Sequence, residues 1–203
     1  MSPLPPFAAV VLAGGRSARL GGQAKPQLDV GGRTMLATVL DAVEGAVQRV
    51  VVGPSQPVPD GVLLVRETPP GGGPVPALAA GLAAVSPGTE VVAVLAADLP
   101  FVTRDLVDQL RERLTGDGVL VVDGTGRDQL LLGVWRTASL RAASAGARPH
   151  APLRGLLAPL TVTRHLPVVR AGEPAPWTDC DTPAELARAR TAADARLPGP
   201  TVG

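Results

Sequence analysis

Short apolar runs alternate with longer amphipathic segments along most of this chain. The apolar runs contain few polar breaks, as expected of strands buried on both faces of a sheet. They cover residues 7–13, 49–53, 62–66, 91–97, 119–123, 129–135 and 162–166. Apolar residues at helical spacing predict helices over residues 34–46, 74–85, 103–114, 137–145, 152–157 and 183–197. Repeated strand–helix–strand units in this order imply an α/β fold with a mainly parallel sheet and helices on both faces.

One strand is expected to break the parallel pattern. Only residues 124–128 separate the run 119–123 from the run 129–135. A connection this short cannot form a crossover, so residues 129–135 should be the antiparallel partner of a hairpin. The sequence has no convincing domain boundary, and we expect a single domain over residues 1–203 with disordered ends at residues 1–6 and 198–203.

Composition limits the function only in a general way. A length of 203 residues suits one domain with a sizeable core, and a formal net charge of +1 argues against a general nucleic-acid or membrane-surface binder. The single cysteine, Cys180, fits a reducing compartment. No signal peptide is apparent, and no apolar run approaches the roughly 20 residues of a membrane helix. We therefore expect a cytoplasmic protein.

The most informative segment is the loop after the first strand. The strand stops at Gly14 and Gly15, and the following loop carries Arg16, Arg19 and Lys25. Glycines let the backbone approach a ligand closely, while free N–H groups and cations bind phosphate. Nucleotides bind at this edge of open α/β sheets. The spacing fits neither a Walker loop nor a dinucleotide-binding fingerprint. A turn with solvated charges is the alternative, although it would not need this many cations and glycines.

An aspartate follows the apolar run 91–97. A carboxylate at the end of a central strand is well placed to hold Mg²⁺ opposite a triphosphate, which makes Asp98 a candidate metal ligand. The alternative is that Asp98 caps the next helix. That role is better filled by Thr103, which directly precedes the helical pattern.

Two further carboxylates precede the last predicted helix. Thr182, Pro183 and Glu185 are explained completely by a capping box with proline at the first helical position. The capping box does not explain Asp179 and Asp181, whose alternation places them on the same side of an extended segment. They could supply a second metal ligand or orient a substrate.

The polar turn over residues 123–129 carries a cation that could bind phosphate. Any hairpin can use such a turn, so Arg127 could equally be a solvated side chain. Arg154 is a second candidate with less support. His150 and His165 lack partners at metal-ligand spacing and are expected to be surface or structural residues.

In the order in which they occur, these segments resemble the molybdenum cofactor guanylyltransferases, a family of MobA-like NTP transferases. Residues 11–26 are similar to the family's Leu-Ala-Gly-Gly-x-x-x-Arg-x-Gly-x-x-Lys-Pro motif, with one extra residue before Lys25. Residues 123–129 are similar to Asp-Gly-x-x-Arg-x-His/Gln, and residues 177–186 to Asn/Asp-x-Asn/Asp-Thr-Pro-x-Asp/Glu-Leu. Residues 73–75 resemble the start of the Gly-Pro-Leu-Ala-Gly loop of guanylyl-transferring members, with Glu67 where an aspartate is expected. The resemblance extends from Val10 to about Leu186.

The resemblance implies a Rossmann-like nucleotidyltransferase fold and an enzyme that uses Mg²⁺. The implied reaction transfers GMP from GTP to the phosphate of Mo-molybdopterin and releases pyrophosphate. The implied partners are GTP and a molybdopterin-type acceptor, with no nucleic acid and no membrane, and the implied state is a monomer or weak homo-oligomer. The implied roles are catalysis by Arg19 and Lys25, nucleotide binding by Leu12, Ala13, Gly14, Gly15, Lys25, Glu67, Gly73 and Asp98, metal binding by Asp98 and Asp181, and acceptor binding by Arg127 and Asp179.

Two other functions stay open at this point. One is transfer of NMP from CTP or another NTP to a different phosphate acceptor, such as a related pterin cofactor or a sugar phosphate. The other is a catalytically silent nucleotide-binding relative. The glycine-rich loop after Glu67 favours guanine, because it can wrap a purine while an acid accepts from the base edge, but a linker without function would look similar.

Overall fold

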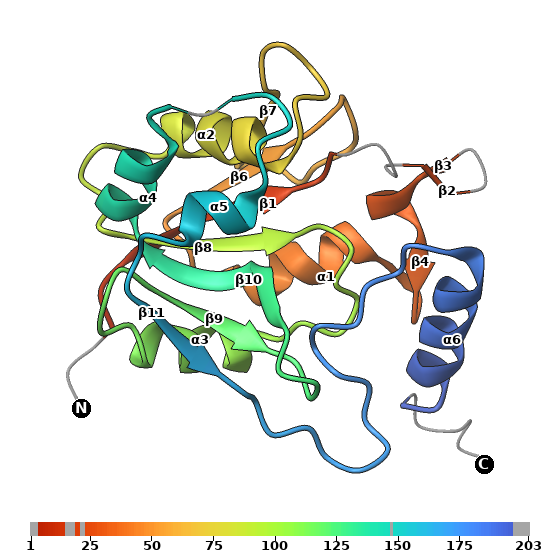
Figure 1. The fold of residues 1–203 in the computed structure, drawn as a ribbon. Helices are drawn as coiled ribbons and strands as arrows, with labels where there is room; N and C mark the ends of the chain where they lie inside the picture. Colours follow the sequence, from red (N-terminus) through yellow and green to blue (C-terminus); the bar gives the residue numbers. More distant parts are fainter. Residues whose placement is uncertain (1–3, 15–18, 21–22, 147, 197–203) are drawn as a thin grey trace.

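A seven-stranded mixed sheet forms the centre of the protein (Figure 1). The computed structural model describes residues 4–14, 19–20, 23–146 and 148–196. The strand order across the sheet is β11 (Val162–His165), β9 (Gly118–Val122), β10 (Asp128–Arg136), β8 (Val91–Ala96), β1 (Phe7–Leu12), β6 (Gln48–Val52) and β7 (Val62–Val65).

All but one of these strands run in the same direction. β1 pairs in parallel with β6 and β8, β6 pairs in parallel with β7, and β9 pairs in parallel with β11. β10 is antiparallel to both β8 and β9, as the short connection after β9 predicts. The predicted α/β fold, with one antiparallel strand in a mainly parallel sheet, is therefore confirmed.

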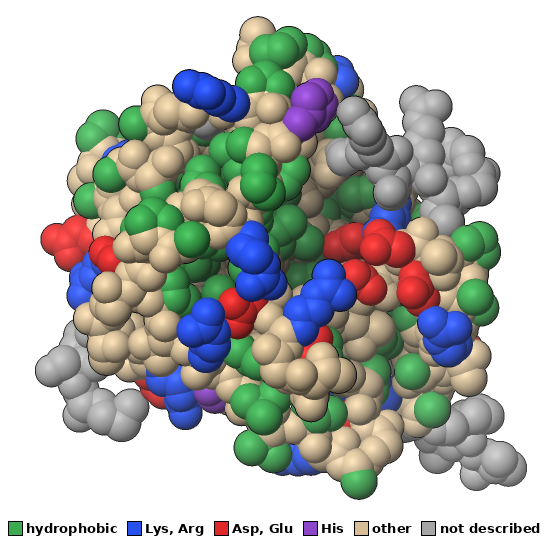
Figure 2. Space-filling view, in the orientation of Figure 1, with side chains coloured by type: hydrophobic (Ala, Val, Ile, Leu, Met, Phe, Trp, Pro, Cys, Tyr) green, Lys and Arg blue, Asp and Glu red, His purple; other side chains and the backbone are tan. Residues whose placement is uncertain are grey.

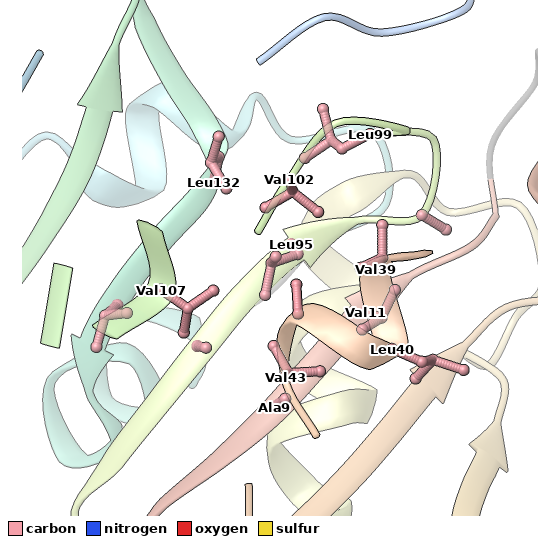
Figure 3. Close-up of a cluster of buried hydrophobic side chains, with 14 of the residues drawn as sticks. Ala9, Val11, Val39, Leu40, Val43, Leu95, Leu99, Val102, Val107 and Leu132 are labelled. Carbon is pink, nitrogen blue, oxygen red and sulfur yellow. The ribbon is translucent and has the colours of Figure 1, made fainter. Parts of the chain in front are cut away.

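Helices cover both faces of the sheet because the apolar strands present side chains to both. On one face, Ala9 and Val11 of β1 pack in a cluster with Val39 and Val43 from α1 (Met35–Ala42) and its end (Figure 3). α3 (Arg104–Glu112) joins the same cluster. The opposite face is covered by α2 (Pro74–Ala84), α4 (Thr137–Ser144) and α5 (Leu153–Leu157).

The packing of α2 requires a glycine. A Cβ atom at Gly81 would lie 2.5 Å from a methyl carbon of Val10, so only a residue without a side chain lets α2 approach β1 this closely. This approach brings the first turn of α2 to the end of the sheet where β1 finishes (Figure 1). The same end carries the candidate site.

The helices end slightly earlier than predicted. α1 stops at Ala42 instead of residue 46, because a turn closed by Ala46 N–H donating to the Val43 carbonyl at 3.0 Å returns the chain to the sheet. α3 and α6 (Pro183–Asp194) also finish a few residues before their predicted ends. Thr103 and Thr182 cap these two helices as expected.

The segment between β1 and α1 is more ordered than predicted. We expected a loop, but the chain forms two small ribbons and a short 3-10 helix. They are β2 (Arg19–Leu20) with β3 (Gln23–Ala24), η1 (Lys25–Gln27), and β4 (Asp29–Val30) with β5 (Arg33–Thr34). A third apolar cluster docks α6 against this segment and includes Leu28, Val30, Met35, Phe101, Cys180, Leu186 and Ala189. The docking holds the start of α6 beside η1.

The N-terminal end is partly fixed. Residues 4–6, which we expected to be disordered, are described, and the Pro5 carbonyl accepts a hydrogen bond of 2.8 Å from Arg111. Residues 1–3 and 198–203, also expected to be disordered, lie outside the described residues. No helix within the described ranges is long and apolar enough to cross a membrane.

Candidate active site

Two adjoining pockets open at the edge of the sheet where β1 and β8 end. The first, here called the glycine-loop pocket, has a volume of about 400 Å³ and is lined by Leu12, Gly14, Glu67, Gly71, Gly73, Pro74, Ala77, Ala96, Asp98, Leu131, His150 and Ala151. The second, here called the acidic pocket, has a volume of about 380 Å³ and is lined by Pro74, Ala96, Asp98, Leu99, residues 127–132, Leu153, Arg154, Trp177, Asp179 and Asp181. Asp98 belongs to both pockets. Each volume is within the range of pockets that hold small molecules.

Most residues expected to bind nucleotide lie around the glycine-loop pocket. Leu12, Gly14, Glu67, Gly73 and Asp98 line it together. They lie at or follow the ends of three parallel strands, β8, β1 and β7, which all finish at this edge of the sheet, where nucleotides bind in open α/β folds.

The remaining residues of that prediction lie elsewhere. Ala13 is buried, and its N–H donates to the Val52 carbonyl at 2.8 Å, so it supports the loop and does not line either pocket. Gly15 lies outside the described residues. The backbone of Arg19 is part of β2, but its side chain is also outside the described part of the structure.

Glu67 holds the glycine-rich loop in place. Its side chain is largely buried, with 8% of the residue exposed, and Oε1 accepts a hydrogen bond of 2.8 Å from the Gly71 N–H. Gly71 and Gly73 have φ angles of 79° and 92°, in the region that favours glycine. Glu67 therefore stabilises the loop through a hydrogen bond, a role that the sequence did not predict.

This role of Glu67 can be tested by comparing two variants. Glu67→Ala is expected to lower the free energy of unfolding by about 1–3 kcal/mol, because the loop loses the hydrogen bond from the Gly71 N–H to a buried charged acceptor. Glu67→Gln keeps an acceptor oxygen at the same place and is expected to cost clearly less. Urea denaturation of both proteins gives the comparison. An equal loss in both variants would show that the negative charge, and not the hydrogen bond, stabilises the loop.

Lys25 joins two carboxylates at the mouth of the acidic pocket. Its Nζ lies 2.5 Å from Oδ2 of Asp98 and 2.5 Å from Oδ1 of Asp181. Lys25 is only 5% exposed, whereas the side chains of Asp98 and Asp181 are 22% and 58% exposed. Burial by itself lowers the pKa of Lys25, but the hydrogen bonds and charges of the two aspartates more than offset this and raise it above its ordinary value. The side chain is therefore an ammonium ion at neutral pH.

The segment before α6 presents its carboxylates on one side, as predicted. Asp179 and Asp181 line the acidic pocket, while Cys180 between them is completely buried in the cluster under α6. Burial, followed by the charge of nearby Asp98, raises the pKa of the Cys180 thiol to about 11. Burial, followed by the charges of Asp181 and Asp98, also raises the pKa of Asp179. Asp98, Asp179 and Asp181 thus lie near Lys25, and Asp128 is a fourth carboxylate in the lining of the same pocket.

These side chains fit a divalent cation that shares its coordination with a substrate. Asp98 and Asp181 offer oxygen atoms, the donors that Mg²⁺ and Mn²⁺ prefer, and both face the same point. Within the described ranges, no group of three or more His, Cys, Asp or Glu side chains could hold a metal. Mg²⁺ is usually held by one or two carboxylates, with water and substrate phosphates as its other ligands.

Basic side chains form the other wall of the acidic pocket. Arg127 stands at the tip of the β9–β10 turn, which Asp123 organises by accepting hydrogen bonds that lower its pKa to about 2. Arg154 lies 3.7 Å from Asp128, whose carboxylate is also bound by Arg164 through two hydrogen bonds. In Figure 2, acidic side chains gather to the right of the centre of this face, with basic side chains beside them.

The sequence did not lead us to predict that Trp177 and His150 line these pockets. Trp177, at the start of the late acidic motif, lines the acidic pocket and packs against the apolar core. His150 lines the glycine-loop pocket, with a φ of 62° and a backbone N–H that donates to the Gly72 carbonyl at 2.6 Å. Trp177 could have been predicted to line the pocket because it lies two residues before Asp179. Nothing in the sequence indicates that His150 lines a pocket.

The chain is similar in sequence to known proteins of one family. The family model described as "MobA-like NTP transferase domain" matches residues 9–193. A protein of Mycobacterium tuberculosis H37Rv, named probable molybdenum cofactor guanylyltransferase, is 37% identical over 138 residues, which cover 65% of this chain and 69% of that protein.

Solved structures share the fold. Molybdopterin-guanine dinucleotide biosynthesis protein A from Archaeoglobus fulgidus superposes with a TM-score of 0.67 at 18% identity, covering 93% of this chain and 99% of that chain. A structure from M. tuberculosis H37Rv, determined in complex with manganese, has a TM-score of 0.67 at 18% identity and covers 93% of this chain and 100% of that chain. With most of its length matched by the family model, and with relatives that carry the name molybdenum cofactor guanylyltransferase, the chain belongs to the family of MobA-like NTP transferases.

Proposed function

We propose that this protein transfers GMP from GTP to the phosphate of a molybdopterin-type acceptor and releases pyrophosphate. The observation that carries the proposal is the position of Asp98 on the boundary between two pockets of similar size. A nucleotidyl transfer must bring two polyanions together at one point, and such a boundary provides that point. The names of the curated relatives support the choice of GTP and of the acceptor.

The glycine-loop pocket is the proposed nucleotide site. Its backbone groups at Gly71 and Gly73 can face the edge of a purine, and Glu67 lies at the same wall. Oε1 of Glu67 is bound to Gly71, while Oε2 makes no hydrogen bond within the described part of the chain. Oε2 is therefore the oxygen that we propose accepts from the guanine edge.

The acidic pocket is the proposed acceptor site. Arg127 and Arg154 can bind the anionic groups of the acceptor, and Trp177 offers an apolar surface to a flat ring system. Asp179 lines the same pocket close to Asp98 and Asp181, where its carboxylate can orient the acceptor. This combination suits an acceptor that is both charged and heteroaromatic.

The proposed chemistry needs no general base. A phosphate monoester has a second pKa near 6, so the attacking group is mostly a dianion at neutral pH. Lys25, and by the family motif Arg19, would stabilise the charge that develops on the α-phosphate and on the leaving pyrophosphate. A divalent cation, proposed to be Mg²⁺ on Asp98 and Asp181, would neutralise further phosphate charge when bound. The residues of this chain thus mainly position and neutralise two anions.

The hydrogen bond between Glu67 and Gly71 favours a second candidate function, transfer of a nucleotide other than GMP. Because Oε1 of Glu67 already binds the loop, recognition of guanine by this acid depends on a single oxygen. Transfer of another nucleotide, such as CMP from CTP, to a different phosphate acceptor would use the same two pockets. A catalytically silent relative would keep the pockets without turnover.

Nucleotide preference distinguishes these functions. GTP is expected to be preferred over ATP by at least about a hundredfold in kcat/KM, because a wrong base leaves buried polar groups unpaired. Pyrophosphate release with GTP, ATP, CTP and UTP, each with Mg²⁺ and molybdopterin, measures the preference. Equal use of CTP and GTP would support the second candidate. Binding of GTP without turnover of any of the four nucleotides would support the silent relative.

A further inference from the structure

The contact between Lys25 and the two aspartates has a consequence for metal binding. Nζ of Lys25 lies at 2.5 Å from an oxygen of each carboxylate, so one nitrogen occupies the point on which both converge. Mg²⁺ binds carboxylate oxygens at about 2.0–2.1 Å, close to the position of this nitrogen. The ammonium group and a divalent cation that bridges Asp98 and Asp181 cannot both be present there.

Lys25 is an unusual cation in this chain. It is the only lysine, since every other basic residue apart from the two histidines is an arginine. An ammonium group is a compact point charge on a flexible stem, whereas a guanidinium group is a broad planar fork. A lysine can therefore occupy a position of atomic size between two carboxylates and also leave it by rotation of its side chain.

The charges around Lys25 explain why it stays in this position without a ligand. Asp98 and Asp181 together carry two negative charges, and the single ammonium group that contacts both neutralises only one of them. A nucleoside triphosphate bound in the adjoining glycine-loop pocket would add phosphate charges next to Asp98. Those phosphates would compete with the carboxylates for the ammonium group of Lys25. Without the ammonium group, the carboxylates would be able to bind a divalent cation.

From this geometry we propose that Lys25 is a resident counter-cation which prevents Asp98 and Asp181 from binding a divalent cation until a nucleoside triphosphate draws its ammonium group away. The inference rests on the proposed function, because it takes a nucleoside triphosphate as the ligand of the glycine-loop pocket. Its consequence is positive coupling between metal and nucleotide, and by linkage each must strengthen the binding of the other equally.

The first test measures Mn²⁺ alone, without nucleotide. The electron paramagnetic resonance signal of free Mn²⁺ reports binding to the wild-type protein and to Lys25→Met. The variant is expected to bind Mn²⁺ at least about tenfold more tightly than the wild type, within the usual range of such couplings. Unchanged or weaker Mn²⁺ binding by Lys25→Met would overturn the inference.

A matched variant separates this effect from a general change of charge. Arg127→Met also removes one positive charge from the acidic pocket, but Arg127 has no ion pair with Asp98 or Asp181 among the described residues. Its affinity for Mn²⁺ alone is expected to change much less than that of Lys25→Met. An equal gain in both variants would show that long-range charge, and not occupation of the site, controls metal binding, and would overturn the inference.

A second measurement uses the wild-type protein and does not depend on the folding of a variant. Because the chain has one lysine, labelling with ¹⁵N-lysine gives a single side-chain ammonium signal in NMR spectra. The signal is expected to stay unchanged when Mg²⁺ alone is added and to shift when GTP and Mg²⁺ are added together. A shift with Mg²⁺ alone, at the affinity seen with GTP, would overturn the inference. The Mn²⁺ experiment contains no nucleotide and no acceptor, so its failure is distinct from a failure of the guanylyl-transfer assay.

Discussion

Lys25→Ala is expected to reduce the rate of GTP-dependent pyrophosphate release at least about a hundredfold, or about 2.7 kcal/mol or more, the effect of removing one group that stabilises a developing oxyanion. The side chain is buried beside the proposed nucleotide site, and the two carboxylates keep it positively charged before the substrate arrives. Steady-state pyrophosphate release with GTP, Mg²⁺ and molybdopterin measures the effect.

An exposed arginine provides the control for Lys25→Ala. Arg33 forms an ion pair with Asp41 on the surface, with 55% of its side chain exposed, and it lines neither pocket. Arg33→Ala removes the same charge and is expected to keep full activity. Circular dichroism and thermal melts establish that both variants are folded. Activity of folded Lys25→Ala within a few-fold of the wild type would remove Lys25 from the mechanism.

Asp98→Asn is expected to lower turnover at least about a thousandfold and to weaken Mg²⁺-dependent binding of GTP, because a proposed Mg²⁺ ligand is lost at the boundary of the two pockets. The stability of the free protein is expected to change little. The side-chain amide of the variant would keep an acceptor oxygen for Lys25, and Asp181 would keep the compensating charge. Melts with and without Mg²⁺ and GTP, together with pyrophosphate release, test both expectations.

Asp117, an aspartate with a structural role, provides the control for Asp98→Asn. Asp117, just before β9, accepts hydrogen bonds from Ser139 at 2.6 Å and from the Thr161 N–H at 2.8 Å. Asp117→Asn is expected to lower the melting temperature while leaving the Mg²⁺ dependence of GTP binding intact. If Asp98→Asn behaves in this way, its role is structural, and the proposed metal site is wrong.

The sequence was sufficient to predict the order and type of the main elements. Strands buried on both faces read as unbroken apolar runs, and the helices between them show apolar residues at helical spacing, so each element is encoded in its own residues. The direction of β10 was also predictable, because the connection before it is too short for a crossover. The edge that carries the site then follows from the parallel topology.

The segment between β1 and α1 could not be predicted in the same way. Its ribbons are only two residues long, too short to show any periodicity. One of them, β4, packs against α6, from the far end of the chain, through the cluster that contains Cys180. Glu67 is a related case, since its bond to Gly71 depends on the folded path of the glycine-rich loop.

By itself, the sequence determined the α/β architecture, the cationic loop at the end of β1, and the pairing of Asp179 and Asp181 on one side of an extended segment. Each of these features depends on residues that lie close together in the sequence. Only the tertiary structure decided that Lys25 would contact Asp98 and Asp181, which lie 73 and 156 residues away along the chain. Such contacts depend on how whole elements dock, because the packing of α6 against β4 sets the distance between side chains that no local pattern connects.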